Sequence, residues 1–319
     1  DAWWLTDGTL EVKGDLIAKD NWYDSSGWGK YYYSFDTRYN FTLLLTGDGI
    51  QTIDIPTDNK IVNLVQGEKS ILQLEKGLTV NNLKSDIKIQ DLEKTLSVVN
   101  GNEKQVELLG KCTGNINVKK TIVKANTDIT SGNLRLSNSS AKIWGDVNAI
   151  NIEIKDESKI EISKDCKIKD LFIENGRMEV GGDCTYTRTI RMQNTEGYLK
   201  ICGDLYADGY SRLYGDYYLT NGTLEIYGDI IARDNWSEKR TDYSWYYYYS
   251  FDTADNFKIF FNGNGIQTIS IPANNQVANL QQGEDSIIQA SNNLNITNLQ
   301  SDCHMENVAK ATIKNWNDY

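Results

Sequence analysis

A short alternating segment that ends at an aspartate, usually within Gly-Asp, recurs along the chain and limits the folds open to it. Five copies stand at residues 143–147, 162–166, 180–184, 201–205 and 226–230, with their aspartates 19, 18, 21 and 25 residues apart. A repeat of this length, alternation of apolar and polar residues, Gly-Asp and Asn-Gly turn signals and almost no helical period are typical of stacked strand turns. We therefore predict an all-β protein, folded as a right-handed parallel β-helix (β-solenoid) with long aromatic-rich loops.

The alternation also predicts which side chains face the core. In residues 222–227, Leu224 and Ile226 share one side of a strand, while Thr223 and Glu225 share the other. One rung cannot bury its apolar edge alone, so stacking must stabilise it. The residue after the aspartate is predicted to form one interior column, which consists of Leu16, Val147, Cys166, Cys184, Leu205 and Ile230.

Two cysteines of this column raise a question of pairing. Cys166 and Cys184 would lie in neighbouring rungs, about 4.8 Å apart at the strand spacing. This separation allows a disulfide, but it also suits two buried thiols, and we favour the thiols. Cys202 falls on the outward phase. The chain has five cysteines, so at least one is unpaired or bonded to another molecule.

The stacked aspartates need an explanation, because like charges at strand spacing repel one another. One interpretation is that each carboxylate accepts hydrogen bonds from backbone N–H groups of its own turn, as Asp commonly does beside Gly. The other is a calcium ladder. The sequence lacks the regular Gly-Gly-x-Gly-x-Asp nonapeptide of calcium-binding β-rolls, so we favour turn capping and predict no metal site and no cofactor.

At a larger scale, residues 5–86 return as residues 219–302. The copies share Leu-Thr-x-Gly-Thr-Leu-Glu at residues 5–11 and 219–225, Asp-Asn-Trp at 20–22 and 234–236, and Gly-Ile-Gln-Thr-Ile at 49–53 and 265–269. The offset is 214 residues before the aromatic segment and 216 after it, so only that segment changes length. We predict a single domain, residues 1–319, in which the two related segments flank a run of regular rungs.

Aromatic residues gather at the same place in both copies. Residues 22–35 hold seven of them and residues 236–251 hold eight. The row of alternate side chains that carries Phe35 is predicted to pack inward. Residues 23–30 and 237–245 are predicted to be surface loops, because they lack alternation and are rich in polar or turn-forming residues.

Large aromatics in polar loops usually mark a recognition surface, and we favour this role over satellite packing. The residues predicted to form the surface are Trp22, Tyr23, Trp28, Tyr32, Trp236, Tyr243, Trp245, Tyr246 and Tyr248. Such a surface suits sugars, because a pyranose has an apolar C–H face that stacks on an indole or phenol, and hydroxyls that need planar polar partners. The rigid wall of a β-helix matches a linear polysaccharide better than a small ligand.

The composition excludes several other functions. Lys and Arg number 33 against 44 Asp and Glu, a net charge of −11, so the chain lacks the basic surface that nucleic acids or anionic membranes require. The single histidine, His304, cannot supply a multi-histidine metal site, and the adjacent Cys303 would point to the opposite face of a strand. No apolar run is long enough for a transmembrane helix. The chain begins at Asp1 without Met, which predicts a mature or excised fragment.

Two repeated runs resemble those of extracellular β-solenoid proteins of Gram-positive bacteria. The first is Gly-Thr-Leu-Glu-x-x-Gly-Asp, at residues 8–15 and 222–229. The second is Gly-x-x-Gln-Thr-Ile, which stands at residues 49–53 and 265–269 in a form one residue shorter. Within that type, the chain length, the aromatic loops and the lack of catalytic residues resemble the C-terminal β-helix of tāpirins. These are cellulose-binding surface proteins of thermophilic, plant-degrading bacteria. The resemblance implies non-catalytic attachment to insoluble cellulose, an extracellular location at the cell surface, and a further N-terminal part. No tāpirin binding residue is matched position by position.

We therefore predict a monomeric, non-catalytic adhesin that attaches to insoluble plant polysaccharide, cellulose first, by aromatic stacking. The main alternative is a β-helical polysaccharide lyase or glycoside hydrolase, because stacked rungs can bring distant carboxylates together. Against a pectate lyase, the acidic chain would repel an anionic uronate. The third alternative is a protein-binding adhesin or structural stalk, but a stalk has no use for exposed Trp28 or Trp245, and a protein interface would favour Arg and Met near its anchors.

Overall fold

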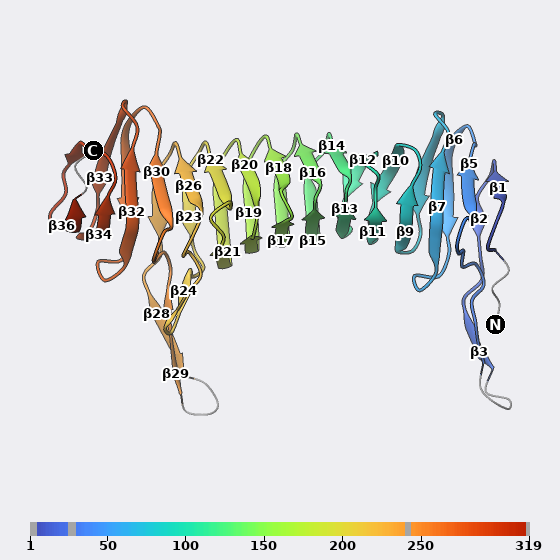
Figure 1. The fold of residues 1–319 in the computed structure, drawn as a ribbon, viewed down its shortest axis with the longest axis horizontal. Coiled ribbons are helices and arrows are strands. Elements are labelled where there is room, and N and C mark those ends of the chain that lie inside the picture. The colour runs from blue at the N-terminus through green and yellow to red at the C-terminus, as the bar shows by residue number, and fades with distance from the viewer. Residues whose placement is uncertain (1–4, 25–29, 240–243, 317–319) are drawn as a thin grey trace. The chain divides into compact units, whose positions relative to one another are not determined.

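The structure is a computed structural model that describes residues 5–24, 30–239 and 244–316. All the regular secondary structure of these residues is β-strand, and the strands stack as a parallel β-helix, which confirms the predicted fold class (Figure 1). Among the same residues there is no helix with the length and hydrophobicity needed to cross a membrane. The coils group into two compact units, residues 1–145 (unit 1) and residues 146–319 (unit 2).

In unit 1, the coils supply strands to two parallel series. The first series is β1 (Thr9–Val12), β5 (Thr42–Leu45), β7 (Lys60–Gln66), β9 (Leu78–Leu83), β11 (Leu96–Asn100), β13 (Ile116–Lys119) and β15 (Ile129–Ser137). The second series is β2 (Leu16–Ile17), β6 (Gly49–Asp54), β8 (Ser70–Leu74), β10 (Ile87–Leu92), β12 (Gln105–Cys112), β14 (Ile122–Ala125) and β16 (Ser140–Ile143). Each strand pairs with the next in its series, one coil further along.

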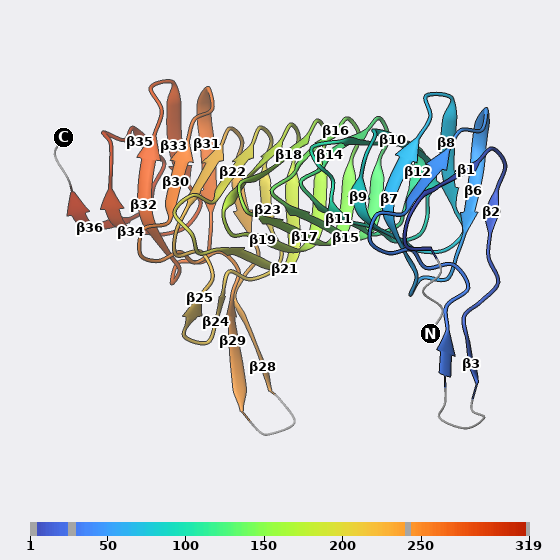
Figure 2. The same cartoon turned by 45° about the vertical axis from the view of Figure 1, so that its right-hand side comes forward.

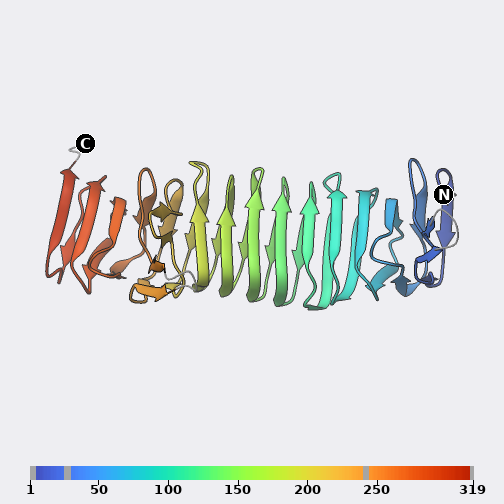
Figure 3. The same cartoon turned by 90° about the horizontal axis from the view of Figure 1, so that it is seen from below.

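Unit 2 is built in the same way, and its strands lie side by side in Figure 3. One series is β18 (Ser158–Ile162), β20 (Gly176–Val180), β22 (Tyr198–Ile201), β26 (Thr223–Ile226), β30 (Lys258–Phe261), β32 (Gln276–Gln282), β34 (Leu294–Leu299) and β36 (Ala311–Trp316). The other is β17 (Val147–Lys155), β19 (Cys166–Ile173), β21 (Cys184–Met192), β23 (Leu205–Ala207), β27 (Ile230–Ala232), β31 (Gly265–Ser270), β33 (Ser286–Ala290) and β35 (Met305–Glu306).

The core follows the predicted alternation. Leu224 and Ile226 are buried, whereas Thr223 and Glu225 between them are half-buried on the other face. The predicted interior column is confirmed in unit 2, where its members are buried and paired in register from coil to coil. They are Val147, Cys166, Cys184, Leu205 and Ile230. In-register stacking of this kind lets each rung bury the apolar edge of its neighbour.

The cysteines of the column are free thiols. Cys166 and Cys184 are direct neighbours in the ladder, and both are buried and unbridged. Cys202 is exposed, as its outward phase predicts. The structure therefore agrees with the interpretation that Cys166 and Cys184 are two buried thiols and not a disulfide.

We expect Cys202 to react first when the folded protein is treated with iodoacetamide at mildly alkaline pH. Burial raises the pKa of the Cys112 thiol to about 12 and the pKa of Cys166 well above its ordinary value, so almost no reactive thiolate forms at either residue. Burial also raises the pKa of Cys303, which should react more slowly than Cys202. Mass spectrometry of the labelled peptides before and after denaturation tests this order. Rapid labelling of Cys166 in the folded state would contradict the packing.

The aspartates that end the segments form a ladder between coils. Asp165 Oδ1 accepts the backbone N–H of Asp183 at 2.9 Å, Asp183 Oδ1 accepts that of Asp204 at 2.8 Å, and Asp204 Oδ1 accepts that of Asp229 at 2.8 Å. The aspartates thus cap backbone N–H groups, which confirms the predicted role. The donor, however, lies in the next coil, whereas we had predicted one in the aspartate's own turn. Parallel stacking causes the difference, because it places each carboxylate over the following turn.

The carboxylate ladder also explains the glycine of the Gly-Asp pair. A Cβ at Gly203 would lie 2.2 Å from Asp183 Oδ1, and one at Gly228 would lie 2.3 Å from Asp204 Oδ1. The carboxylate of one coil therefore occupies the space that a side chain of the next coil would need. Within the described residues, no group of three His, Cys, Asp or Glu side chains is placed to hold a metal ion.

A buried glutamine accounts for the run Gly-Ile-Gln-Thr-Ile in each copy. Gln267 is 1% exposed, and its Nε2 donates to the carbonyls of Ile226 and Gly228 at 3.1 and 2.8 Å. Its Oε1 accepts the Gly263 N–H at 2.8 Å and the Ser286 hydroxyl at 2.7 Å. The amide therefore ties three successive coils together.

The equivalent glutamine of unit 1, Gln51, repeats these contacts with Val12, Gly14, Gly47 and Ser70. The glycine two positions before each glutamine has a positive φ, 100° at Gly49 and 87° at Gly265, which favours glycine over other residues.

The described parts of the aromatic segments form β-hairpin strands, although we had predicted surface loops over residues 23–30 and 237–245. In unit 1, β3 (Trp22–Asp24) pairs antiparallel with β4 (Lys30–Tyr32). In unit 2, β28 (Trp236–Lys239) pairs antiparallel with β29 (Trp245–Tyr249). Each hairpin projects away from the coils of its own unit (Figures 1 and 2). Residues 237–239 alternate too weakly to indicate a strand, but they become one by pairing with residues 245–247. Residues 25–29 and 240–243, which make up most of the rest of the predicted loops, lie outside the described residues.

Candidate functional site

The hairpin of unit 2 belongs to a small antiparallel sheet. The sheet has the order β25-β24-β29-β28, in which β24 (Arg212–Leu213) and β25 (Asp216–Tyr217) come from the connection between β23 and β26. Arg212 pairs with Tyr249 and with Tyr217, and Trp236 pairs with Tyr248. Residues paired directly across antiparallel strands share a face, so these pairings divide the aromatic side chains between two faces.

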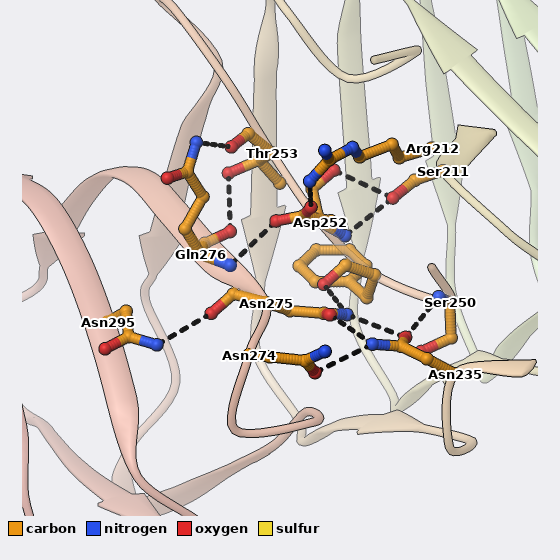
Figure 4. A network of polar contacts seen from close by, with 11 residues as sticks. Ser211, Arg212, Asn235, Ser250, Asp252, Thr253, Asn274, Asn275, Gln276 and Asn295 are labelled. Atoms are coloured by element: carbon orange, nitrogen blue, oxygen red, sulfur yellow. Dashed lines mark hydrogen bonds and ion pairs between the residues drawn. The ribbon is translucent and has the colours of Figure 1, made fainter. Parts of the chain in front are cut away.

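Asparagine and aspartate side chains fix the foot of this sheet to the coils (Figure 4). Asn235 Oδ1 accepts the Ser250 N–H at 3.0 Å, which joins the two ends of the hairpin, and Asn235 Nδ2 donates to Asn275 Oδ1 at 2.6 Å. Asn275 Nδ2 in turn donates to the Phe251 carbonyl at 2.9 Å. Tyr186, which is buried in β21, donates its hydroxyl to the Ser250 carbonyl. The hairpin therefore leaves the coil from a constrained base.

Asp252 links the same foot to β24. Its carboxylate accepts from Arg212 Nη1 at 2.8 Å and from the Gln276 N–H at 2.7 Å, and its own N–H donates to Ser211 Oγ at 2.7 Å (Figure 4). Asp252 is 1% exposed. Burial raises the pKa of Asp252, although the hydrogen bond from Arg212 opposes that rise. The ion pair thus holds β24 and β29 against the coil.

Unit 1 uses the same device at its hairpin. Asn21 Oδ1 accepts the Ser34 N–H at 2.9 Å, and Asn21 Nδ2 donates to Asn59 Oδ1 at 2.8 Å. Asp36 Oδ1 accepts the Lys60 N–H at 3.0 Å, as Asp252 does with Gln276. These contacts give the repeated Asp-Asn-Trp run a structural role at the base of both hairpins.

One face of the sheet in unit 2, the inner face, is packed against itself. Trp236 and Tyr248 stack with their ring centres 5.0 Å apart and their planes 9° apart. Tyr210 meets both rings edge-on, at 6.1 Å from Trp236 and 5.0 Å from Tyr248. Arg233 covers Trp236 with its guanidinium 4.2 Å from the ring centre. Burial raises the pKa of Tyr210. These rings are half-buried and stabilise the sheet.

The opposite face, the outer face, presents a row of rings along β29. Trp245 and Tyr247 are each 50% exposed, and Tyr249 follows on the same face closer to the coils. Arg212 lies between Tyr249 and Tyr217, with its guanidinium 4.3 Å from each ring centre. Burial raises the pKa of Tyr217. The row therefore continues from β29 across Arg212 to β25.

The structure separates the site residues predicted in the second copy. Trp236, Tyr246 and Tyr248 lie on the inner face, and Trp245 lies on the outer face, because neighbouring residues of a strand point to opposite sides. Tyr246 has its ring 6.1 Å from that of Tyr214. Tyr243 lies outside the described residues.

In the first copy, Trp22 is 44% exposed and Tyr23 is 62% exposed, on opposite faces of β3. Lys19 Nζ lies 4.9 Å from the centre of the Trp22 ring. Tyr32 pairs through its backbone with Trp22, and its side chain lies outside the part of the structure that is described. Trp28 lies outside the described residues.

Among the described side chains of the predicted inward row, the phenylalanine alone is buried. Phe35 and its counterpart Phe251 are buried, but Tyr33 is 38% exposed and Tyr247 is 50% exposed. The row leaves the core because the hairpin departs from the coil immediately before the phenylalanine.

Several residues of the outer and inner faces were not predicted. They are Tyr210, Tyr217, Tyr247, Tyr249 and Arg212. Residues 206–218 contain five tyrosines, which is the signal that could have indicated them. Their pairing with residues 245–249 depends on an antiparallel contact that the repeat pattern does not encode.

No protein-family model, curated protein or solved structure matches this chain.

Proposed function

We propose that this protein is a non-catalytic adhesin of the cell surface that binds a linear, neutral plant polysaccharide, with cellulose as the first candidate. One observation carries the proposal: Trp245, Tyr247 and Tyr249 form a row on the outer face of a strand whose foot is fixed to the coils. Alternate residues of a strand lie about 7 Å apart, so the rings form a regular track. A track of this kind offers stacking to successive sugar rings of an extended chain.

The chemistry of the row favours sugar over other ligands. Half-exposed Trp and Tyr rings present an apolar face with a polar edge, which matches the C–H face and the hydroxyls of a pyranose. The net charge of −11 disfavours polyanions such as nucleic acid or pectin. The chain length, the aromatic loops and the lack of catalytic residues resemble the C-terminal β-helix of tāpirins, and this resemblance favours cellulose among the neutral polymers.

A pull-down assay tests the proposal. Incubation with microcrystalline cellulose should deplete the protein from the supernatant, and pectin should deplete it less because of charge repulsion. Xylan in the same assay shows how far binding depends on the sugar. The supernatants should contain no released sugar. If the protein binds none of the three polymers, carbohydrate attachment is refuted. New reducing ends or unsaturated products in the supernatants would instead support the lyase or hydrolase alternative.

A further inference from the structure

At the foot of the sheet in unit 2, next to β25, the surface forms an open polar hollow of about 810 Å³. Its principal lining side chains are Arg191, Asp216, Tyr217, Tyr218, Asp255 and Lys314. These residues come from β21, from the segment around β25, from the turn before β30, and from β36. Coils that are far apart in sequence therefore contribute to one concave surface within the unit.

The hollow continues the aromatic row. Tyr217 belongs to both, because it stacks on Arg212 opposite Tyr249 and also lines the hollow. The register places Arg212, Tyr217 and Tyr249 on one face of the sheet. A chain that follows the outer face from Trp245 towards the coils would therefore arrive at the hollow.

The hollow carries equal numbers of positive and negative side chains, and these are not paired with one another. Arg191 and Lys314 contribute two cations, and Asp216 and Asp255 contribute two carboxylates. Arg191 packs on Tyr218, with its guanidinium 4.4 Å from the ring centre. In the part of the chain that the structure describes, none of these four charged side chains forms an ion pair.

We propose that the hollow is a second subsite of the same binding surface and holds a further residue of a neutral polysaccharide. The inference rests on the proposed function. The carboxylates of Asp216 and Asp255 accept hydrogen bonds from sugar hydroxyls, Arg191 and Lys314 donate to sugar oxygens, and Tyr217 supplies the stacking surface. An acidic sugar fits less well, because its carboxylate would meet two aspartates with no net positive charge to offset them.

The test uses a variant in which the exposed hollow charges are neutralised with little change of shape: Asp216→Asn, Asp255→Asn and Lys314→Gln. The control variant carries the same charge changes at exposed positions of unit 2 outside the hollow: Glu284→Gln, Asp285→Asn and Lys310→Gln. Calorimetric titration of the whole protein with cellohexaose should show about tenfold weaker binding for the hollow variant and unchanged binding for the control.

The outcomes separate this inference from the proposed function. If the wild type and the hollow variant bind cellohexaose equally, the second subsite is refuted and the aromatic row stands. If the wild type binds neither cellohexaose nor cellulose, both proposals fail. If the wild type binds an oligogalacturonate more tightly than cellohexaose, the assignment to neutral sugars is wrong. Thermal melts that coincide for all three proteins show that the substitutions leave the fold intact.

Discussion

Replacing Trp245 and Tyr247 together by alanine is expected to weaken binding to cellulose about 30- to 1000-fold, with little change in the melting temperature. Both rings are half-exposed on the outer face, so their removal takes away stacking surface without opening the core. A well-placed aromatic ring contributes about 1–2 kcal/mol to an interface, so two together contribute about 2–4 kcal/mol. Depletion isotherms on microcrystalline cellulose measure the effect.

Two comparison variants make this result specific to the outer face. Tyr39→Ala removes a ring of unit 1 that is 73% exposed and belongs to neither hairpin, and it should leave binding unchanged. Trp236→Ala breaks the stack with Tyr248 and Tyr210. Its main effect should therefore be a lower melting temperature of the protein, with a smaller effect on binding than that of the double variant. Full retention by the Trp245→Ala, Tyr247→Ala double variant would refute the assignment of the outer face.

Replacing Gln267 by leucine is expected to lower the free energy of unfolding of unit 2 by about 3–5 kcal/mol. The side chain is almost fully buried, and its amide makes four hydrogen bonds to three successive coils. Leucine fills similar space but leaves the Gly263 N–H, the Ser286 hydroxyl and the Gly228 carbonyl without this partner, whereas the Ile226 carbonyl keeps the Asn262 N–H. Each orphaned group costs about 1–3 kcal/mol before relaxation. Urea denaturation followed by circular dichroism measures the loss.

The matched control is Gln289→Leu on β33. Gln289 lies on the half-buried outward phase of its strand, where the same chemical change should cost less than about 0.5 kcal/mol. Gln51→Leu should reproduce the large loss in unit 1, because Gln51 makes the equivalent contacts. Equal stability of the Gln267→Leu and Gln289→Leu variants would show that the buried amide does not hold the coils together.

Much of the coil could be predicted from the sequence because the interactions that build it are periodic. Alternation decides which side chains enter the core, and a repeat near 20 residues decides which of them stack, so the column from Val147 to Ile230 was predictable. The direction of the aspartate hydrogen bonds could not be predicted from the sequence. Asp183 caps Asp204 one coil away, and only the offset between stacked coils decides whether the donor is local or not.

The candidate site was predictable as a region but not as a surface. Composition and the large repeat indicate that residues 22–35 and 236–251 carry the aromatic residues, and that the chain is acidic and poor in histidine. They also show that only the aromatic segment differs in length between the copies. These properties depend on residue identity alone, and the sequence by itself determines them.

The tertiary structure alone decides which rings are available to a ligand. Trp245 and Tyr246 are neighbours in sequence, yet the hairpin register places them on opposite faces. Tyr210 then covers the inner face, and Arg212 carries the outer row on to Tyr217. The physical reason is that a strand assigns its side chains to two sides, whereas the partner that buries one side comes from a segment elsewhere in the chain, through contacts with no period in the sequence.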